Sequence, residues 1–290
     1  MKSFKKTPYT LNLGGRLCPL DRPMVMGILN ITPDSFFDGS RTPNDAPDTI
    51  RQRTRRMLDE GADILDIGAY STRPGADDVS ADEEMRRLAS ALSVIRDEAP
   101  DAILSVDTFR AEVAKNCVEE FGVQIINDIS GGTMDKAMLR TVARLGLPYV
   151  LMHTQGDPST MQLAPHYDDV VAEVIEHLAR RVQRLRDYGG KDIIIDPGFG
   201  FGKTLEHNYR LMERLDDFHE LGCPMLVGIS RKSMIYRLLQ TSPQEALNGT
   251  TVLNTIALMK GAHILRVHDV APAVEACKLV AVMQAAASQS

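Results

Sequence analysis

The chain has 290 residues, a formal net charge of −6 and an isoelectric point near 5.7. This acidic balance argues against a general nucleic-acid-binding protein, which would present a strongly basic face. Apolar residues make up 43 % of the chain, enough to bury a large core and to exclude wholesale disorder. No linker or low-complexity run suggests a second domain, so we expect one domain over residues 1–290.

Cysteine usage and the N-terminal residues predict a cytoplasmic protein that does not associate with a membrane. The N-terminus is basic but lacks the apolar run of a signal peptide. The apolar stretch 251–265 is too short to span a bilayer and is interrupted by polar residues. The cysteines form no C-x-x-C pair and are expected to be reduced thiols: Cys18, Cys117, Cys223 and Cys277.

In chain order, the sequence predicts a hairpin followed by alternating strands and helices. Residues 8–20 are expected to form a hairpin that plugs the bottom of a barrel, with Gly14-Gly15 as its turn. Apolar runs without polar alternation predict parallel strands that are covered on both faces. These runs lie at 24–29, 64–67, 103–106, 124–126, 149–152, 193–195, 225–228 and 264–267. Helices are expected between them, as at 48–60, 80–98, 168–188 and 208–221, and the last helix over 270–287.

The number of these units decides the fold class. Eight strand–helix units favour a closed (β/α)₈ barrel over an open doubly wound sheet. The residues after the first strand lack the G-x-G-x-x-G that a dinucleotide-binding fold would need. We therefore predict an α/β protein with a single (β/α)₈ TIM barrel and a short N-terminal β-hairpin.

The predicted strands end in polar residues, where barrels carry their chemistry. Asp107, Asn127 and Asp196 offer acceptors and an amide suited to a flat heterocycle rich in N–H donors. Donors suited to a phosphate or diphosphate come from Arg266, His268 and Arg73, and from the loop amides near Thr72.

Two further residues complete this predicted site. Asn30 is a neutral oxygen ligand for Mg²⁺, which takes one or two protein oxygens besides substrate phosphates and water. Lys232 is a cation that would bridge the heterocycle and the phosphate region.

Each of these residues also has a purely structural interpretation. Asp107 would be the N-cap of the next helix, and Asn127-Asp128 and Asp196 would be turn residues. Arg266 and His268 would form a solvated surface pair, and Lys232 would be an ordinary residue of a helix's first turn. The placement of all of them at successive strand ends favours a shared site.

A glycine-rich segment at 198–203, Gly-Phe-Gly-Phe-Gly-Lys, lacks the spacing of a nucleotide-binding P-loop. Alternating Gly and Phe suggests a backbone close to a planar ligand with an aromatic face available for stacking. The alternative is a tight connection with both phenylalanine rings in the core.

Seven motifs in order resemble the dihydropteroate synthases, over residues 24–278. They are MGILNITPDSFFD (26–38), DIGAYSTRPG (66–75), SVDTF (105–109), INDISGG (126–132), DPGFGFGKT (196–204), GISRKS (228–233) and RVHDV (266–270). Tyr70 departs from the family pattern, because many members have an acidic residue there. We expect this difference to alter loop packing and not the diphosphate contacts.

The resemblance implies a role for each matching residue. Asn30 would hold Mg²⁺ against the substrate diphosphate, which Thr72, Arg73, Arg266 and His268 would bind. The pterin would be held by Asp107, Asn127, Met152, Asp196, Phe199 and Lys232, and p-aminobenzoate by Phe36, Asp38, Thr72, Pro74, Phe199 and Ser230. The residues with catalytic roles would be Asp107, Lys232, Arg266 and His268.

The implied reaction joins a dihydropterin methylene group to p-aminobenzoate, with diphosphate leaving in an SN1-like step. Loops 30–43 and 70–78 would close over the substrates. The family is the target of sulfonamides, and its members are commonly homodimers. Two alternatives stay open: a pterin-dependent methyltransferase acting on a corrinoid protein, and a non-catalytic pterin-binding homologue. The first usually lacks the Ser-Thr-Arg-Pro-Gly loop, and the second would have lost a residue such as Lys232.

Overall fold

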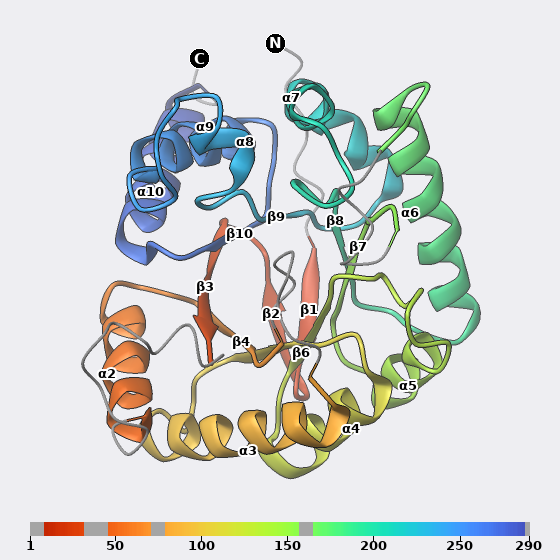
Figure 1. Ribbon diagram of the computed structural model, residues 1–290, viewed down its shortest axis with the longest axis vertical. Coiled ribbons are helices and arrows are strands. Elements are labelled where there is room, and N and C mark those ends of the chain that lie inside the picture. The colour runs from red at the N-terminus through yellow and green to blue at the C-terminus, as the bar shows by residue number, and fades with distance from the viewer. Residues whose placement is uncertain (1–8, 32–45, 71–78, 157–164, 288–290) are drawn as a thin grey trace.

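The computed structural model describes residues 9–31, 46–70, 79–156 and 165–287, and these form a barrel of parallel strands surrounded by helices (Figure 1). The strands lie in the order β8-β7-β6-β5-β4-β3-β10-β9. A parallel bridge between Ile195 and Met225 connects the two ends of this sheet, so the predicted barrel fold is confirmed. The strands are β3 (Met24–Asn30), β4 (Ile64–Gly68), β5 (Leu104–Asp107), β6 (Ile125–Asp128), β7 (Tyr149–Met152), β8 (Ile193–Asp196), β9 (Leu226–Val227) and β10 (Ile264–Val267).

Each expected strand is present, and most differ from the prediction by one or two residues at an end. β9 is only two residues long, and the preceding Met225 makes the bridge that closes the sheet. The helices are α2 (Ala46–Asp59), α3 (Ala81–Glu98), α4 (Ala111–Phe121), α5 (Met138–Leu145), α6 (Val170–Asp187), α7 (Leu205–Glu213), the 3₁₀ helix η2 (Leu215–Leu221), α8 (Ser233–Tyr236), α9 (Leu247–Met259) and α10 (Val270–Ala287).

One predicted helix, at 208–221, is wrong in its extent, because the structure has α7 and η2 in its place. The Thr204 hydroxyl accepts a hydrogen bond from the backbone N–H of His207, and the two residues form a capping box. A cap of this kind satisfies backbone donors that the first helical turn leaves without partners. The helix therefore begins at Leu205, three residues before the predicted start.

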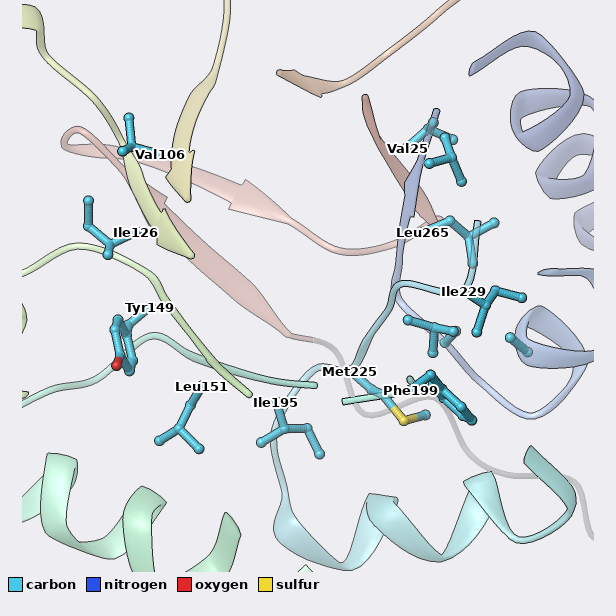
Figure 2. Close-up of a cluster of buried hydrophobic side chains, with 14 of the residues drawn as sticks. Val25, Val106, Ile126, Tyr149, Leu151, Ile195, Phe199, Met225, Ile229 and Leu265 are labelled. Carbon is cyan, nitrogen blue, oxygen red and sulfur yellow. The ribbon is translucent and has the colours of Figure 1, made fainter. Parts of the chain in front are cut away.

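Side chains alternate between two environments along each strand, as the strand period of two requires. One set points outward and packs with the helices in the main core, which includes Val106, Ile126, Leu151, Ile195 and Leu265 (Figure 2). The other set points into the barrel. At its lower end this inward set is apolar, and it forms a floor under the remaining inward positions.

The N-terminal hairpin contributes to this floor. β1 (Thr10–Leu13) and β2 (Arg16–Pro19) pair antiparallel, and the turn residues Gly14 and Gly15 have φ of 63° and 90°. Such angles favour glycine because it has no Cβ. Figure 1 shows the hairpin in the middle of the ring of helices. Its apolar side chains pack with inward residues of the strands in one buried cluster: Leu11, Leu13, Leu20, Met24, Met26, Ile64, Ile125, Val150, Ile194, Leu226 and Ile264. The hairpin thus closes the barrel's bottom, as predicted.

Candidate active site

A layer of polar side chains lies directly above the apolar floor. Each of these residues follows a floor residue by two positions, so it points into the barrel from the same strand. Asp66 follows Ile64, and Asn127 follows Ile125. Asp196 follows Ile194 and Arg266 follows Ile264 in the same way. The floor and the polar layer together form a site that is apolar below and charged above.

The guanidinium of Arg266 joins two acidic residues within this layer. Its Nε donates to Asp66 Oδ2 at 2.7 Å, and its Nη2 donates to Asp107 Oδ2 at 2.7 Å. Only 19 % of the Arg266 side chain is exposed, so the alternative of a solvated surface residue is wrong. Although burial lowers the pKa of Arg266, the carboxylates of Asp66 and Asp107 raise it above its ordinary value. Arg266 is therefore a fixed cation inside the barrel.

Asp66 is a residue that the sequence interpretation missed. Its fully buried carboxylate accepts from Ser105 Oγ at 2.6 Å, from Asn127 Nδ2 at 3.0 Å and from Arg266. The signal was a charged residue inside an apolar strand, two positions after an inward isoleucine. A buried carboxylate needs such partners, since an unpaired charge away from water is strongly destabilising.

Asp107 lies at the end of β5 and does not cap the following helix. The first backbone N–H of α4, that of Ala111, donates instead to Asp135 Oδ2 at 2.8 Å. Burial raises the pKa of Asp107 to about 7, against the opposing effect of Arg266. Asp107 is thus a carboxyl group that changes its protonation near neutral pH and can accept or donate a hydrogen bond.

The turn interpretation of the Asn127-Asp128 pair holds for Asp128 alone. Asp128 accepts from the backbone N–H groups of Ser130 at 2.7 Å and Gly132 at 2.8 Å, and from the Tyr149 hydroxyl at 2.6 Å. Asn127 bonds to Asp66 in the polar layer. The structure therefore separates a turn residue from a neighbouring site residue.

Asp196 combines a turn role with a place in the site. Its Oδ1 accepts from the backbone N–H of Gly198 at 2.7 Å. Burial raises the pKa of Asp196, while the positive charge of Lys232 opposes that rise. Burial likewise lowers the pKa of Lys232 to about 8, and Asp196 opposes that change. The carboxylate and the ammonium thus stabilise each other's charge across the barrel mouth.

The two phenylalanines of the glycine-rich loop have different positions. Phe199 is fully buried in the main core, where Figure 2 shows its ring beside Met225. The expected contact of this ring with a bound ligand therefore disagrees with the structure. Phe201 is half-buried, and Lys232 Nζ lies 4.6 Å from its ring centroid. Phe201 also packs at the mouth against a small apolar cluster of Phe109, Ile129 and Met152.

Ser230 and His268 lie together on the loops after β9 and β10. Ser230 Oγ accepts from the backbone N–H of His268 at 3.1 Å and lies 3.0 Å from its Nδ1. Because a hydroxyl can both donate and accept, the Ser230 side chain can hold either tautomer of the imidazole in this position. The same loop is held by Arg231, whose Nε and Nη2 form an ion pair with Asp269. His153, another strand-end residue, turns away from the site to the buried Lys203.

Asn30 ends β3 beside Gly68, whose missing side chain leaves space around the amide. A Cβ built at Gly68 would lie 3.4 Å from Asn30 Oδ1 and 3.6 Å from Asp107 Cβ. Within the described part of the chain, no three His, Cys, Asp or Glu side chains gather to hold a metal. One neutral oxygen fits a Mg²⁺ ion that takes its other ligands from a substrate diphosphate and water. The predicted residues Phe36, Asp38, Thr72, Arg73 and Pro74, and most of the two predicted mobile loops, lie outside the described residues.

Comparison with known proteins agrees with this geometry. The family model described as "Pterin binding enzyme" matches residues 26–268. The dihydropteroate synthase of Escherichia coli is 46 % identical over 92 % of this chain and 93 % of its own length. The Synechocystis dihydropteroate synthase is 43 % identical over 89 % of each chain.

Solved structures give the same result. Yersinia pestis dihydropteroate synthase with a sulfonamide drug complex superposes with a TM-score of 0.88 at 41 % identity, covering 97 % of this chain and 100 % of that one. The Xanthomonas albilineans dihydropteroate synthase with 4-aminobenzoic acid superposes with a TM-score of 0.87 at 41 % identity, covering 96 % and 99 %. The chain therefore belongs to the pterin-binding enzymes and, within them, to the dihydropteroate synthases.

Proposed function

We propose that this chain condenses (7,8-dihydropterin-6-yl)methyl diphosphate with p-aminobenzoate to give 7,8-dihydropteroate and diphosphate. The observation that carries the proposal is the polar layer above the apolar floor. Asp107, Asn127 and Asp196 offer acceptors and an amide to one flat heterocycle, with Lys232 and Arg266 beside them. A heterocycle rich in N–H donors gains charge-assisted hydrogen bonds from such carboxylates.

The same layer suits the charge that develops during the reaction. As diphosphate leaves, positive charge grows at the pterin methylene carbon, and the nearby carboxylates stabilise it. Negative charge grows on the leaving diphosphate. Among the residues that the structure describes, Arg266 and His268 are the ones we expect to stabilise that charge. Lys232, with a pKa of about 8 between Asp196 and the ring of Phe201, lies where the two substrates would meet. No covalent intermediate with the protein is required.

We propose that Mg²⁺ binds through Asn30 together with the substrate diphosphate. When bound, the ion would neutralise charge on the departing diphosphate. Asn30 is held at the end of its strand, where Arg53 Nη1 donates to the backbone carbonyl oxygen of Asn30 at 3.1 Å. This bond leaves the side-chain amide oxygen of Asn30 available as the ligand. Isothermal titration of the substrate diphosphate with and without Mg²⁺ tests this role. In Asn30→Ala the affinity gained from Mg²⁺ is expected to disappear, and an unchanged gain would contradict it.

The synthase reaction itself is tested by measuring both products. Purified protein is incubated with Mg²⁺ and both substrates, and equimolar dihydropteroate and diphosphate are expected. Lys232→Ala and Asp196→Asn are expected to lower kcat/KM by about 100-fold or more, as losses of transition-state contacts do. Matched controls are Lys191→Ala and Asp168→Asn, because both residues are exposed.

Each outcome of this assay has a clear meaning. Folded protein that binds the pterin diphosphate but forms no dihydropteroate would refute the proposal. Methyl transfer from methyltetrahydrofolate to a corrinoid protein would then be assayed, and its absence would leave a non-catalytic pterin-binding protein. Equal losses in Lys232→Ala and Lys191→Ala would instead refute the assigned site.

We also propose that the protein forms a homodimer through α10. By length and composition this helix could cross a membrane, but only 28 % of it is buried and it packs on β3 and α9 as a barrel helix. Its exposed face carries Leu279, Val282 and Met283, next to Glu275 and Lys278. Opposite charges beside an apolar strip suit a twofold contact between two copies more than a bilayer. Light scattering of Val282→Glu should give a monomer, while a wild-type monomer would contradict the proposal.

A further inference from the structure

Lys203 is a buried lysine to which the reaction described above gives no role. Its side chain is 4 % exposed, and its Nζ has three acceptors at 2.9 Å: His153 Nδ1, the carbonyl oxygen of Gly198 and that of Phe201. The His153 carbonyl oxygen is a fourth neighbour at 3.4 Å. Among the described residues none of these partners is a carboxylate. The ammonium is therefore bound by neutral groups inside the wall of the barrel.

The number of acceptors matches the number of protons on an ammonium. Lysine has three N–H donors when charged, and three partners lie at a normal hydrogen-bond distance. His153 Nδ1 must then be an acceptor, which requires a neutral imidazole. Burial, together with the charge of Lys203, strongly lowers the pKa of His153, in agreement with this assignment. A neutral amine has only two N–H donors, so it cannot donate to all three partners at once.

The partners of Lys203 include the glycine-rich loop at 198–202. Side chains bind the carbonyl oxygens of this loop from two sides. Lys203 binds those of Gly198 and Phe201 from within, and Lys232 binds that of Phe199 at 2.6 Å from the site. Tyr167 donates to Gly202 at 2.8 Å, which holds the end of the loop. The loop conformation thus depends on side-chain donors.

We propose that Lys203 is a positioning residue for the aromatic amine substrate. Its ammonium and that of Lys232 clamp the loop from opposite sides, and the clamp fixes the ring of Phe201 beneath Lys232. The inference rests on the proposed function for the identity of that substrate. Lys203 acts through the loop and does not touch the reacting atoms. The Phe201 ring that it positions lies at the barrel mouth and is not part of the polar layer assigned to the pterin, so loss of Lys203 should impair binding of the amine more than binding of the pterin diphosphate.

The surroundings of Lys203 connect this role to pH. Burial lowers its pKa to about 7, and Asp196 opposes that change while Lys232 adds to it. An Arg at this position keeps its charge at all working pH values. The titratable groups that interact electrostatically with the ammonium come from several neighbouring elements: His153 after β7, His177 on α6, Asp196 on β8, His207 on α7, and Lys232.

The test compares Lys203→Met with Lys191→Met. Lys191 is an exposed lysine that precedes β8, the strand that Lys203 follows. Steady-state kinetics would give kcat and both KM values at pH 6.5. Lys203→Met is expected to raise the KM for p-aminobenzoate about tenfold, as the loss of charge-assisted hydrogen bonds to the loop implies, and the KM for the pterin diphosphate less than about threefold. Hydrogen–deuterium exchange of peptides covering 198–202 should quicken in Lys203→Met and not in Lys191→Met.

A second comparison uses pH and the conservative variant Lys203→Arg. The wild-type KM for p-aminobenzoate should rise between pH 6 and 9, and the arginine variant should show a smaller rise. The difference between the two profiles excludes the titration of Lys232, which both proteins share. This comparison decides the question if Lys203→Met does not fold.

Three results would overturn the proposal: identical kinetics in Lys203→Met and Lys191→Met, equal rises of both KM values, or identical pH profiles for wild type and Lys203→Arg. A wild-type protein that makes no dihydropteroate would refute the proposed function instead. The exchange rates of the loop would still decide whether Lys203 clamps it.

Discussion

Arg266 and Asp66, 200 residues apart in the sequence, form an ion pair of 2.7 Å inside the barrel. They lie on β10 and β4, which are separated in the sheet by β3 alone. Asp66 also accepts from Ser105 and Asn127, so one carboxylate links residues of four strands. The polar layer is therefore connected by its own hydrogen bonds before a substrate is present. This arrangement limits the reorganisation that substrate binding would require.

Replacing Asp66 should destabilise the fold as well as the site. In Asp66→Ala, Arg266 keeps Asp107 as a partner, but Ser105 and Asn127 lose theirs. Removing one member of a buried pair costs about 3–5 kcal/mol, and we expect a loss near the lower end of this range. Urea unfolding measures it, with the exposed Asp168→Ala as the control. A loss equal to that of the control would show that Asp66 does not hold the layer together.

The raised pKa of Asp107 predicts a defined dependence of stability on pH. Its folded pKa of about 7 lies above the unfolded value of about 3.9, so the folded state binds more protons between these values. Its contribution to stability is therefore fully present below about pH 3.9 and is lost as pH rises through about 7. The free energy of unfolding, measured from pH 5 to 8, should fall more steeply in the wild type than in Asp107→Asn.

The comparison with Asp107→Asn also excludes the other titrating groups. The lowered pKa values of Lys203 and Lys232 act in the opposite direction, since their unfolded states bind more protons above about pH 7 to 8. Both proteins contain these lysines, so the difference between their slopes reports the charge of Asp107, including its effect on the pKa of Lys232, which that charge raises. Parallel slopes would mean that Asp107 is ionised throughout this range in the folded protein.

The sequence was sufficient to predict the barrel, because buried parallel strands leave apolar runs and their polar residues gather at one end. Asp107, Asn127, Asp196 and Arg266 were found by this rule. Asp66 was missed because it lies within a strand and not at its end. Its inward direction follows from the period of two, but its need for a buried cation depends on a strand 200 residues away. No local pattern contains that information.

Which of the two phenylalanines, Phe199 or Phe201, lies in the core could not be predicted, for a different reason. In an extended strand, Phe199 and Phe201 would point to the same side, but Gly198, Gly200 and Gly202 have φ of 73°, 80° and 57°. The period of two therefore does not apply to this loop. One ring enters the main core, and the other lies at the barrel mouth.

The different positions of the two rings predict different effects of their removal. Phe199→Ala should cost about 3–5 kcal/mol of unfolding free energy, as for other fully buried aromatic residues. Phe201→Ala should cost less stability and should raise the KM for p-aminobenzoate, because its half-buried ring lies below Lys232. Urea unfolding and steady-state kinetics on both variants separate these effects. A larger rise in KM for folded Phe199→Ala than for Phe201→Ala would contradict the assignment.

The glycine-rich loop approaches the residue after β7 so closely at Gly198 that a side chain there should clash. A Cβ at this position would lie 1.9 Å from the carbonyl oxygen of His153, and its φ is 73°. Gly146 provides a matched control, because its φ is 67° and a Cβ there would meet nothing within 4 Å. Both alanine variants carry similar backbone strain of about 1–2 kcal/mol. Gly198→Ala carries an additional steric cost of about 1–3 kcal/mol.

The clash in Gly198→Ala should also reach the site. It would displace the backbone N–H that donates to Asp196 and the carbonyl oxygen that accepts from Lys203. We therefore expect lower stability in urea and a loss of synthase activity in Gly198→Ala, whereas Gly146→Ala should lose only stability. If both variants have the same activity and the same unfolding free energy, the loop does not press against β7 as described. Because the control shares the strained backbone angle, the difference between the variants measures the close approach itself.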